Sequence, residues 1–415
     1  MKIEEVKETV IERLIERLGP RLYKGDLENS DLESIVYEVI SEELDNGDLT
    51  LSSIDRANLV QEVVDEVLGI GPIQPLLRNS KVSEIMVNGP DTIYYEKEGK
   101  IFLSDLKFAS TEHLRRIIER IVSQVGRRID EVSPLVDARL PDGSRVNAVV
   151  PPISIDGPTL TIRKFAHEPY EMDDLIAFGS ISDEAAQFLK SCIEARLNIL
   201  ISGGTGSGKT TTLNVLSSYI PDDERIITVE DAAELQLNQP HVVRLESRPL
   251  NIEGEGLITV RDLVRNSLRM RPDRIVVGEV RDGAAFDMLQ AMNTGHDGSL
   301  TTLHANSPKD ALIRLENLVM MAGVDLPVRV LREQIVEALD LVVHQARMRD
   351  GSRKVTAISE ITGIDQESIQ LQEVFRFSLS PKSESTEIGA LNSSGLPLMR
   401  RQKFALRNVA IPEGF

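Results

Sequence analysis

The spacing of apolar residues divides the chain into segments with different expected structures. Over residues 1–70, apolar side chains recur three and four positions apart, which is typical of amphipathic helices that bury one face. The residues that make up this pattern are Ile3, Val6, Val10, Leu14, Leu18, Ile35, Val36, Val39, Ile40, Leu59, Val60, Val63, Val64 and Leu68. Gly71 and Pro72 then interrupt it. The pattern predicts a small helical region over residues 1–70.

Residues 71–165 combine short strand patterns with one clear helix. Apolar runs at residues 85–87 and 92–95 predict strands. The helix carries apolar side chains at a spacing of three and four residues, at Leu114, Ile117, Ile118, Ile121, Val122 and Val125. Its other face is basic and is expected to be solvent-exposed, with Arg115, Arg116 and Arg120. We therefore expect an α+β domain over residues 71–165.

A second, larger domain is expected over residues 174–415, after a charged linker at 166–173 that contains Pro169. Short apolar runs alternate here with helical patterns, and they lie at residues 198–201, 225–229, 275–277 and 299–303. This alternation predicts an α/β fold with a largely parallel sheet covered by helices. The last forty residues are polar and predict a C-terminal tail that is loosely ordered in part.

Residues 203–210 form a complete P-loop between a predicted strand and a predicted helix. Glycines let successive backbone amides turn inward, and the helix N-terminus favours a phosphate. The Lys209 ammonium is expected to reach the β- and γ-phosphates, and the Thr210 hydroxyl to bind Mg²⁺. The predicted nucleotide-binding residues are Gly203, Gly204, Thr205, Gly206, Ser207, Gly208, Lys209, Thr210 and Thr211. The motif predicts a nucleoside triphosphate site.

Hydrolysis also requires a carboxylate that positions water and negative charge that helps to hold Mg²⁺. Glu230 and Glu279 each follow a predicted strand, whereas Gly278 occupies the position where an ordinary P-loop enzyme carries the magnesium-binding Asp. We assign the positioning of the attacking water to Glu279, and the support of Mg²⁺ to Glu230 together with Thr210. The reverse assignment of the two glutamates stays open.

Two histidines flank the last of the predicted parallel strands. His296 precedes this strand and His304 follows it, so His304 is expected at one end of the sheet. A neutral imidazole there can sense the γ-phosphate or orient water. The spacing of eight residues does not match a metal-ligand pair, and a purely structural role for either histidine stays open.

Composition narrows the class of protein. A chain of 415 residues is long enough for two or three domains. Its net charge of −19 disfavours a broad nucleic-acid surface. The single cysteine, Cys192, excludes a disulfide framework and a multi-cysteine zinc module, so we expect no zinc. No apolar run approaches the roughly 18 residues of a membrane span. We expect a cytoplasmic protein that is at most peripheral to a membrane.

Four motifs in this order resemble the secretion ATPases of type II and type IV secretion and of type IV pili. Besides the P-loop, residues 230–235 resemble the acidic box of that family, residues 274–281 its atypical second strand and residues 295–304 its histidine box. The N-terminal half is similar to the CpaF-type ATPases of Flp/Tad pilus assembly. The segments that carry this similarity are residues 69–77, 83–89, 126–130, 137–147 and 161–165.

The resemblance implies a RecA-like ATPase domain and a ring-shaped homohexamer that binds ATP between its N- and C-terminal domains. Their relative movement would drive a platform protein in the inner membrane, with the hexamer peripheral at the cytoplasmic face. The resemblance also implies that Arg139, Arg145 and Arg163 reach the phosphates when the two domains close.

Several functions stay open at this point. The first is a motor for assembly, or also retraction, of a Flp/Tad-type pilus or for related protein secretion. The second is a type IV secretion ATPase that exports DNA or effectors. A nucleic-acid translocase is disfavoured by the net charge. A module that binds ATP without hydrolysis is disfavoured by the intact Lys209, Thr210 and Glu279.

Overall fold

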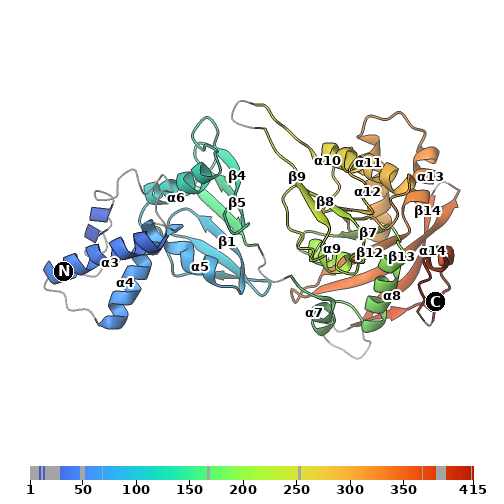
Figure 1. Cartoon of the computed structure of the whole chain (residues 1–415), viewed down its shortest axis with the longest axis horizontal. Coiled ribbons are helices and arrows are strands. Elements are labelled where there is room, and N and C mark those ends of the chain that lie inside the picture. Colours follow the sequence, from blue (N-terminus) through green and yellow to red (C-terminus); the bar gives the residue numbers. More distant parts are fainter. Residues whose placement is uncertain are drawn as a thin grey trace. The chain divides into compact units, whose positions relative to one another are not determined.

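The computed structural model describes residues 9–10, 13–14, 29–46, 52–67, 69–165, 169–250, 254–366, 368–379, 389–412 and 414–415. The chain divides into two compact units, Met1–His167 and Glu168–Phe415 (Figure 1). The division falls at the predicted linker. The two units are described one after the other.

The N-terminal unit begins with helices α3 (Asn29–Asn46) and α4 (Ser53–Val67). They bury a small apolar core of Val10, Leu14, Val36, Val39, Ile40, Leu59, Val60 and Val63. All eight residues belong to the predicted helical pattern. Ile3, Val6, Leu18 and Leu68 lie outside the described residues.

A six-stranded antiparallel sheet and one helix form the rest of this unit. The strands are β1 (Val82–Asn88), β2 (Ile93–Lys97), β3 (Lys100–Leu103), β4 (Leu135–Arg139), β5 (Arg145–Val149) and β6 (Thr159–Arg163), in the spatial order β3-β2-β1-β6-β5-β4. Before β1 come the short helices η1 (Gly71–Ile73) and α5 (Gln74–Arg78). Helix α6 (Thr111–Gln124) packs its apolar face against the sheet, in the predicted manner. The Ser110 hydroxyl caps α6 by accepting from the His113 amide at 3.1 Å.

Arg120 on α6 differs from the expectation of a solvent-exposed arginine. Its guanidinium donates to the carbonyl oxygens of Glu66 and Val67 at the end of α4, at 3.2 and 2.9 Å, and also to that of Gly69. The last carbonyls of a helix have no partner within the helix, and a positive charge near them is favourable. Arg120 therefore joins the helical region to the α+β part of the unit.

A nine-stranded sheet organises the C-terminal unit. Its strands are β7 (Ile199–Gly203), β8 (Ile226–Glu230), β9 (Val242–Glu246), β10 (Arg274–Val277), β11 (Leu300–His304), β12 (Leu341–Arg347), β13 (Arg353–Asp365), β14 (Ser368–Leu379) and β15 (Gly389–Ser393). They follow the order β15-β14-β13-β12-β7-β11-β10-β8-β9. The six strands from β12 to β9 are parallel, and the remaining pairs are antiparallel.

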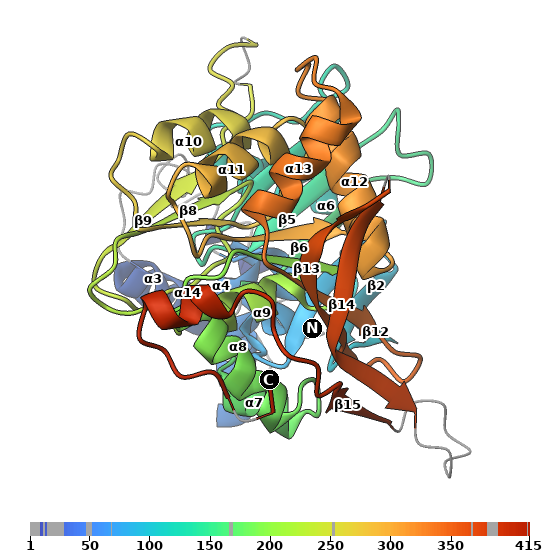
Figure 2. The same cartoon turned by 90° about the vertical axis from the view of Figure 1, so that its right-hand side faces the viewer.

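Helices cover both faces of this sheet (Figure 2). One face packs against α7 (Met172–Ala177), α8 (Asp183–Glu194) and α9 (Lys209–Ser217). The other packs against α10 (Val260–Ser267), α11 (Ala284–Asn293), α12 (Pro308–Met320) and α13 (Val328–Ala338). Because both faces are covered, every residue of β7, β8 and β10 is buried, as is typical of parallel strands. The predicted α/β class with a RecA-like domain is confirmed.

Part of the C-terminal stretch packs against the core of this unit. Phe404 in helix α14 (Arg401–Leu406) is fully buried, and the ring of Phe415 lies 4.9 Å from that of Phe188 and 5.2 Å from that of Phe375. A few apolar residues therefore pack residues 389–412 onto the unit. Residues 380–388 lie outside the described residues, so the expectation of a tail that is loosely ordered in part stays a prediction.

No helix in the described part of the chain combines the length and apolar character needed to cross a membrane.

Candidate active site

The P-loop connects β7 to α9 in the predicted strand–turn–helix arrangement. Gly203 ends β7, residues 204–208 form the turn, and Lys209, Thr210 and Thr211 open the helix. Gly206 and Gly208 have φ angles of +67° and +93°, which side-chain-bearing residues rarely adopt. Lys209 Nζ donates to the Gly204 carbonyl at 2.9 Å, so its ammonium lies over the turn.

Strand β12 and the start of β13 support this turn with two side chains that the sequence does not predict. Gln345 Nε2 donates to the Ser207 carbonyl at 2.6 Å, and Arg353 Nε donates to that of Gly206 at 3.0 Å. A Cβ on Gly203 would lie 2.3 Å from the Gln345 carbonyl oxygen, so only glycine fits there. These contacts fix the carbonyl side of the turn and leave its amides for a phosphate.

His304 and Glu279 meet beside Lys209, at the carboxyl end of the parallel strands. His304 is the last residue of β11 and pairs in register with Gly203. Its ring nitrogens Nδ1 and Nε2 lie 3.4 and 3.5 Å from Lys209 Nζ, and Nε2 lies 3.4 Å from Glu279 Oε1. Glu279 also forms an ion pair with Arg281 at 3.1 Å. The predicted carboxylate, histidine and P-loop lysine are therefore neighbours.

The surroundings of His304 favour its neutral form. Burial lowers the pKa of the imidazole, and the positive charge of Lys209 lowers it further, against the opposing effect of Glu279. A neutral ring has one nitrogen that accepts and one that donates a hydrogen bond. It can therefore contact an ammonium and a carboxylate at the same time.

Glu230 is more deeply buried than Glu279. Its Oε2 accepts from the amides of Glu234 and Leu235 at 2.7 and 3.0 Å, while Oε1 is buried and finds no hydrogen-bond partner among the described residues. Burial raises the pKa of this carboxyl group, and the two amide contacts oppose the rise. A Cβ on Gly278 would lie 3.0 Å from Glu230 Cγ, so the missing side chain at 278 leaves room for Glu230.

The three arginines implied by the family resemblance lie together in the N-terminal unit. Arg139 pairs with Arg145 across β4 and β5, and Arg145 pairs with Arg163 across β5 and β6. Directly opposed residues of antiparallel strands point to the same face of a sheet. The arginines therefore form one row on the face opposite α6, and their approach to a phosphate stays a prediction.

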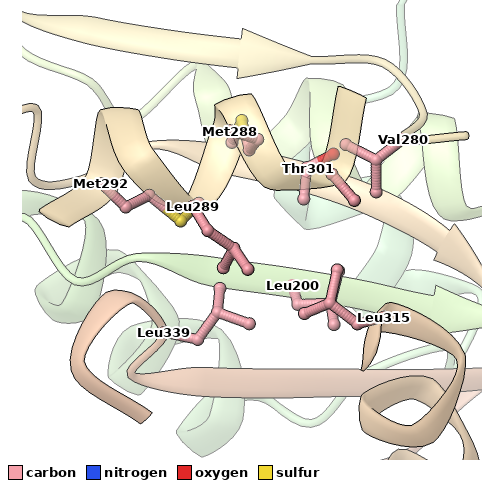
Figure 3. Close-up of a pocket in the computed structure, with 9 residues that line it drawn as sticks. Leu200, Val280, Met288, Leu289, Met292, Thr301, Leu315 and Leu339 are labelled. Atoms are coloured by element: carbon pink, nitrogen blue, oxygen red, sulfur yellow. The ribbon is translucent and has the colours of Figure 1, made fainter. Parts of the chain in front are cut away.

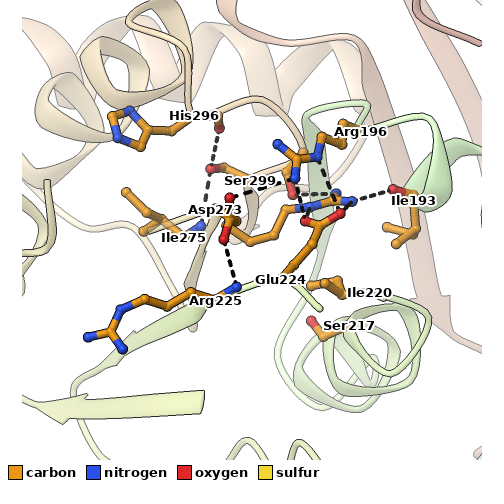
Figure 4. Close-up of polar contacts among 12 residues, drawn as sticks. Ile193, Arg196, Ser217, Ile220, Glu224, Arg225, Asp273, Ile275, His296 and Ser299 are labelled. Carbon is orange, nitrogen blue, oxygen red and sulfur yellow. Dashed lines mark hydrogen bonds and ion pairs between the residues drawn. The ribbon is translucent and has the colours of Figure 1, made fainter. Parts of the chain in front are cut away.

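His296 lies at the other end of β11 from His304, far along the strand from the P-loop. Its Nδ1 lies 3.2 Å from the Ala291 carbonyl, and its own carbonyl accepts from Ser299. The same edge of the sheet holds a buried polar network in which the fully buried Arg274 donates to Glu224 and to the Ile193 carbonyl (Figure 4). Hydrogen bonds with the backbone and with Ser299 hold His296 at this end of the strand, away from the P-loop.

A small cavity lies between α11, α12 and the sheet (Figure 3). Its lining consists of Leu200, Val280, Ala285, Met288, Leu289, Met292, Thr301, Leu315 and Leu339. None of these side chains is charged, so the lining offers nothing that would recognise a phosphate. The cavity is a packing gap behind the active site.

No cluster of three or more His, Cys, Asp or Glu side chains that could hold a metal ion by itself occurs within the described ranges. A divalent ion at this site would therefore depend on ligands from the nucleotide as well. This is the arrangement typical of Mg²⁺ in phosphate sites.

Comparison with known proteins places these residues in a family. Residues 66–382, well over half of the chain, match the family described as Type II/IV secretion system protein. The chain belongs to this family. The match includes the P-loop, both candidate glutamates, both histidine positions and the arginine row.

Individual relatives of the chain also support its membership of the type II/IV secretion system protein family. The chain is 39% identical over 300 residues to a putative conjugal transfer protein of Mycobacterium tuberculosis, covering 71% of this chain and 85% of the relative. It is 32% identical to a type IV secretion system protein, VirB11, of Bartonella quintana, covering 69% and 90%. The solved pilus retraction motor PilT with bound ADP has 19% identity and a TM-score of 0.50, covering 81% of this chain and 86% of that one, which shows a shared fold.

Proposed function

We propose that the protein is an ATP-hydrolysing motor that powers assembly of a Flp/Tad-type type IV pilus. The observation that carries the ATP hydrolysis in this proposal is the contact of His304 with both Lys209 and Glu279 beside the P-loop. A lysine for the phosphates and a carboxylate that positions water are among the groups that phosphoryl transfer to water uses, and the neutral imidazole of His304 lies between them. The assignment to a Flp/Tad-type pilus rests on the resemblance of residues 69–77, 83–89, 126–130, 137–147 and 161–165 to CpaF-type ATPases.

ATP binding is assigned to the P-loop and the start of α9. The amides of residues 204–209 and the α9 N-terminus stabilise the phosphate charge, and Lys209 exchanges its contact with the Gly204 carbonyl for the phosphates. The Glu279 carboxylate accepts a hydrogen bond from the attacking water and thereby orients it. His304 holds the Glu279 carboxylate from the P-loop side.

Mg²⁺ fits the residues at this site. The Thr210 hydroxyl at the start of α9 would supply one oxygen. Glu230 Oε1, which has no hydrogen-bond partner among the described residues, would supply a buried acceptor for the ion or for a water bound to it. When bound, the ion neutralises developing charge on the phosphates. A cation near Glu230 would oppose the effect of burial on the pKa of this carboxyl group.

The arginine row supplies the coupling between hydrolysis and movement in this proposal. A guanidinium delivered to the phosphates only when the two units close makes the rate depend on domain position. The two units would then swing in a homohexameric ring at the cytoplasmic face of the membrane and act on a platform protein embedded in it.

The second candidate is export of DNA or effectors by a type IV secretion machine. The conjugal transfer and VirB11 relatives favour it, because their similarity extends over 85% and 90% of their own lengths. Direct nucleic-acid translocation is disfavoured by the net charge of −19, which would repel a polyanion outside a local basic groove.

The test is the ATPase rate in the presence of Mg²⁺ as a function of protein concentration, with the mass of the assembly measured in parallel. A rate per subunit that rises as a six-subunit species forms, and that is lost on chelation of Mg²⁺, supports the motor. Equal activity of a monomer contradicts the ring. Salt-sensitive binding of single-stranded DNA to the assembled protein would instead favour the translocase.

A further inference from the structure

A row of polar and charged side chains runs along the carboxyl end of the parallel strands and extends past the residues that the proposed chemistry uses. In the order of the strands β7, β11, β10, β8 and β9, they are Lys209, His304, Glu279 with Arg281, Asp231 and Ser247. Each contacts the next. The row therefore connects the P-loop lysine with the edge strand β9.

Arg281 forms the centre of the outer half of this row. Its Nη2 lies 3.1 Å from Glu279 Oε2, and its Nη1 lies 2.9 Å from Asp231 Oδ2. A planar guanidinium presents donors in fixed directions, so it can bridge two carboxylates, whereas an ammonium acts as a point charge. The geometry fixes Arg281 between the ends of β10 and β8.

Asp231 is itself held from the far side. The Ser247 hydroxyl, just after β9, lies 3.1 Å from both the Asp231 carbonyl oxygen and Oδ1. With Oδ1 engaged by Ser247, Oδ2 faces Arg281. The contacts that hold Asp231 therefore determine the position of the Arg281 guanidinium.

Stability does not explain this arrangement. The side chains of Arg281 and Asp231 are 62% and 49% exposed, and exposed ion pairs contribute little to the free energy of unfolding. The effect of the bridge falls instead on Glu279, whose side chain is 25% exposed. With Oε2 held by Arg281, Oε1 is directed to His304 and the P-loop.

We propose that Arg281, anchored by Asp231, is a positioning residue that fixes the orientation of the Glu279 carboxylate for hydrolysis. This inference rests on the proposed ATPase function and adds two residues to it. Arg281 acts through Glu279 and makes no contact with the P-loop among those described. Its loss should therefore slow the chemical step and leave nucleotide affinity unchanged.

The experiment compares steady-state kinetics of the full-length assembled wild type with those of Arg281→Ala, Arg281→Lys and Asp231→Asn. For Arg281→Ala we expect kcat to fall by about 10- to 100-fold, because the carboxylate loses its orientation, with KM for ATP unchanged within about twofold. Arg281→Lys should recover only part of the rate. Asp231→Asn should lower kcat in the same direction.

A double variant tests whether the two residues act as one unit. The losses in Arg281→Ala and Asp231→Asn should not add, so the double variant should match Arg281→Ala. Arg329→Ala is the matched control, because Arg329 also lies 3.1 Å from a glutamate, Glu333, but on α13. Its kinetics and the thermal midpoints of all variants should equal those of the wild type.

The possible outcomes separate the two proposals. Normal kcat in Arg281→Ala, with an active wild type, overturns the positioning role alone. A raised KM with unchanged kcat also overturns it, because it would place Arg281 in binding. Absence of turnover in the assembled wild type overturns the ATPase function, and the positioning role with it.

Discussion

At the scale of single residues, the protonation state of His304 determines how much positive charge lies between Lys209 and Glu279 in the candidate active site. The ring lies between a positive and a negative group, with Nδ1 3.4 Å from Lys209 Nζ and Nε2 3.4 Å from Glu279 Oε1. Burial and Lys209 lower its pKa below the ordinary value of about 6.5. A proton on the ring would add a second positive charge beside Lys209 and bind Glu279 more tightly.

The pH dependence of turnover follows from this lowered pKa. His304 stays neutral at pH 7, and kcat should fall only below about pH 6.5, as the ring gains its proton. The free energy of unfolding depends on pH in the same direction. As the pH falls, His304 takes up its proton first in the unfolded chain, so the stability that this residue contributes is present above its unfolded pKa and is lost below it. Lys209, Arg281 and Arg314 oppose protonation, and Glu279 favours it.

A pH profile of kcat for the wild type and His304→Gln measures this effect. In the variant, kcat should not show the part of the decrease at acidic pH that protonation of the imidazole causes in the wild type. An identical profile for both proteins would remove His304 from the rate-determining chemistry.

The arginine row makes a second prediction at the residue scale. Arg139, Arg145 and Arg163 lie at directly opposed positions of neighbouring strands, and the account assigns them to the phosphates. Arg163→Ala should therefore lower turnover of the assembled protein by about tenfold or more, while the unfolding midpoint stays the same. Arg115→Ala, a change on the surface of α6 in the same unit, is the control. Normal turnover of Arg163→Ala would exclude Arg163 from the site.

The sequence predicts those site residues whose contacts are local or whose motifs are contiguous. The P-loop turn lies within nine consecutive residues, and Glu230, Glu279 and His304 each follow a recognisable apolar strand. Gln345 and Arg353 escape prediction because they contact the loop across separations of 138 and 147 residues. Only the pairing of β12 with β7 brings them there.

At the scale of elements, burial on both faces explains which strands the sequence reveals. Strands β7, β8 and β10 are buried throughout and consist mainly of apolar residues, so they stand out in the sequence. Strand β14 is harder to recognise, because the pairing passes from Ile358–Phe375 to Ser359–Glu373 and leaves Val374 as a bulge. Val374 and Phe375 are both buried, which interrupts the two-residue period.

Helix α14 shows how a polar segment becomes part of the ATPase unit. Asp340, fully buried before β12, pairs with Lys403 at 2.7 Å and with Arg400 at 3.4 Å, and accepts from the Asn198 amide at 2.8 Å. Burial raises the pKa of Asp340, and Lys403 is the largest influence in the opposite direction. The charged groups of α14 therefore compensate for a carboxylate inside the domain.

Lys403→Ala tests this role of α14. The change leaves the buried Asp340 with one charged partner fewer, so the free energy of unfolding should fall by about 2 kcal/mol, somewhat less than for a carboxylate left with no partner. Urea unfolding measures the difference, and Arg401→Ala, an exposed position on the same helix, should change it little. Equal losses in both variants would show that α14 contributes only through its backbone and Phe404.

At the scale of the whole molecule, the groups assigned to hydrolysis are divided between the two units. The Glu168–Phe415 unit provides the lysine, the histidine and the two glutamates, and the Met1–His167 unit provides the arginine row. Neither set alone contains all the groups assigned to hydrolysis. In this account, the rate of ATP hydrolysis depends on the approach of one unit to the other, and this dependence converts chemistry into movement.

The most direct test of the account is ATP turnover and retention by Glu279→Gln, with Lys209→Ala and Glu230→Gln alongside. We expect Glu279→Gln to bind ATP and hold it without appreciable hydrolysis, because amide replaces the carboxylate that orients water, whereas Lys209→Ala should lose affinity. Turnover of Glu279→Gln at the wild-type rate would contradict the account. Trapped ATP in Glu230→Gln instead would exchange the roles of the two glutamates.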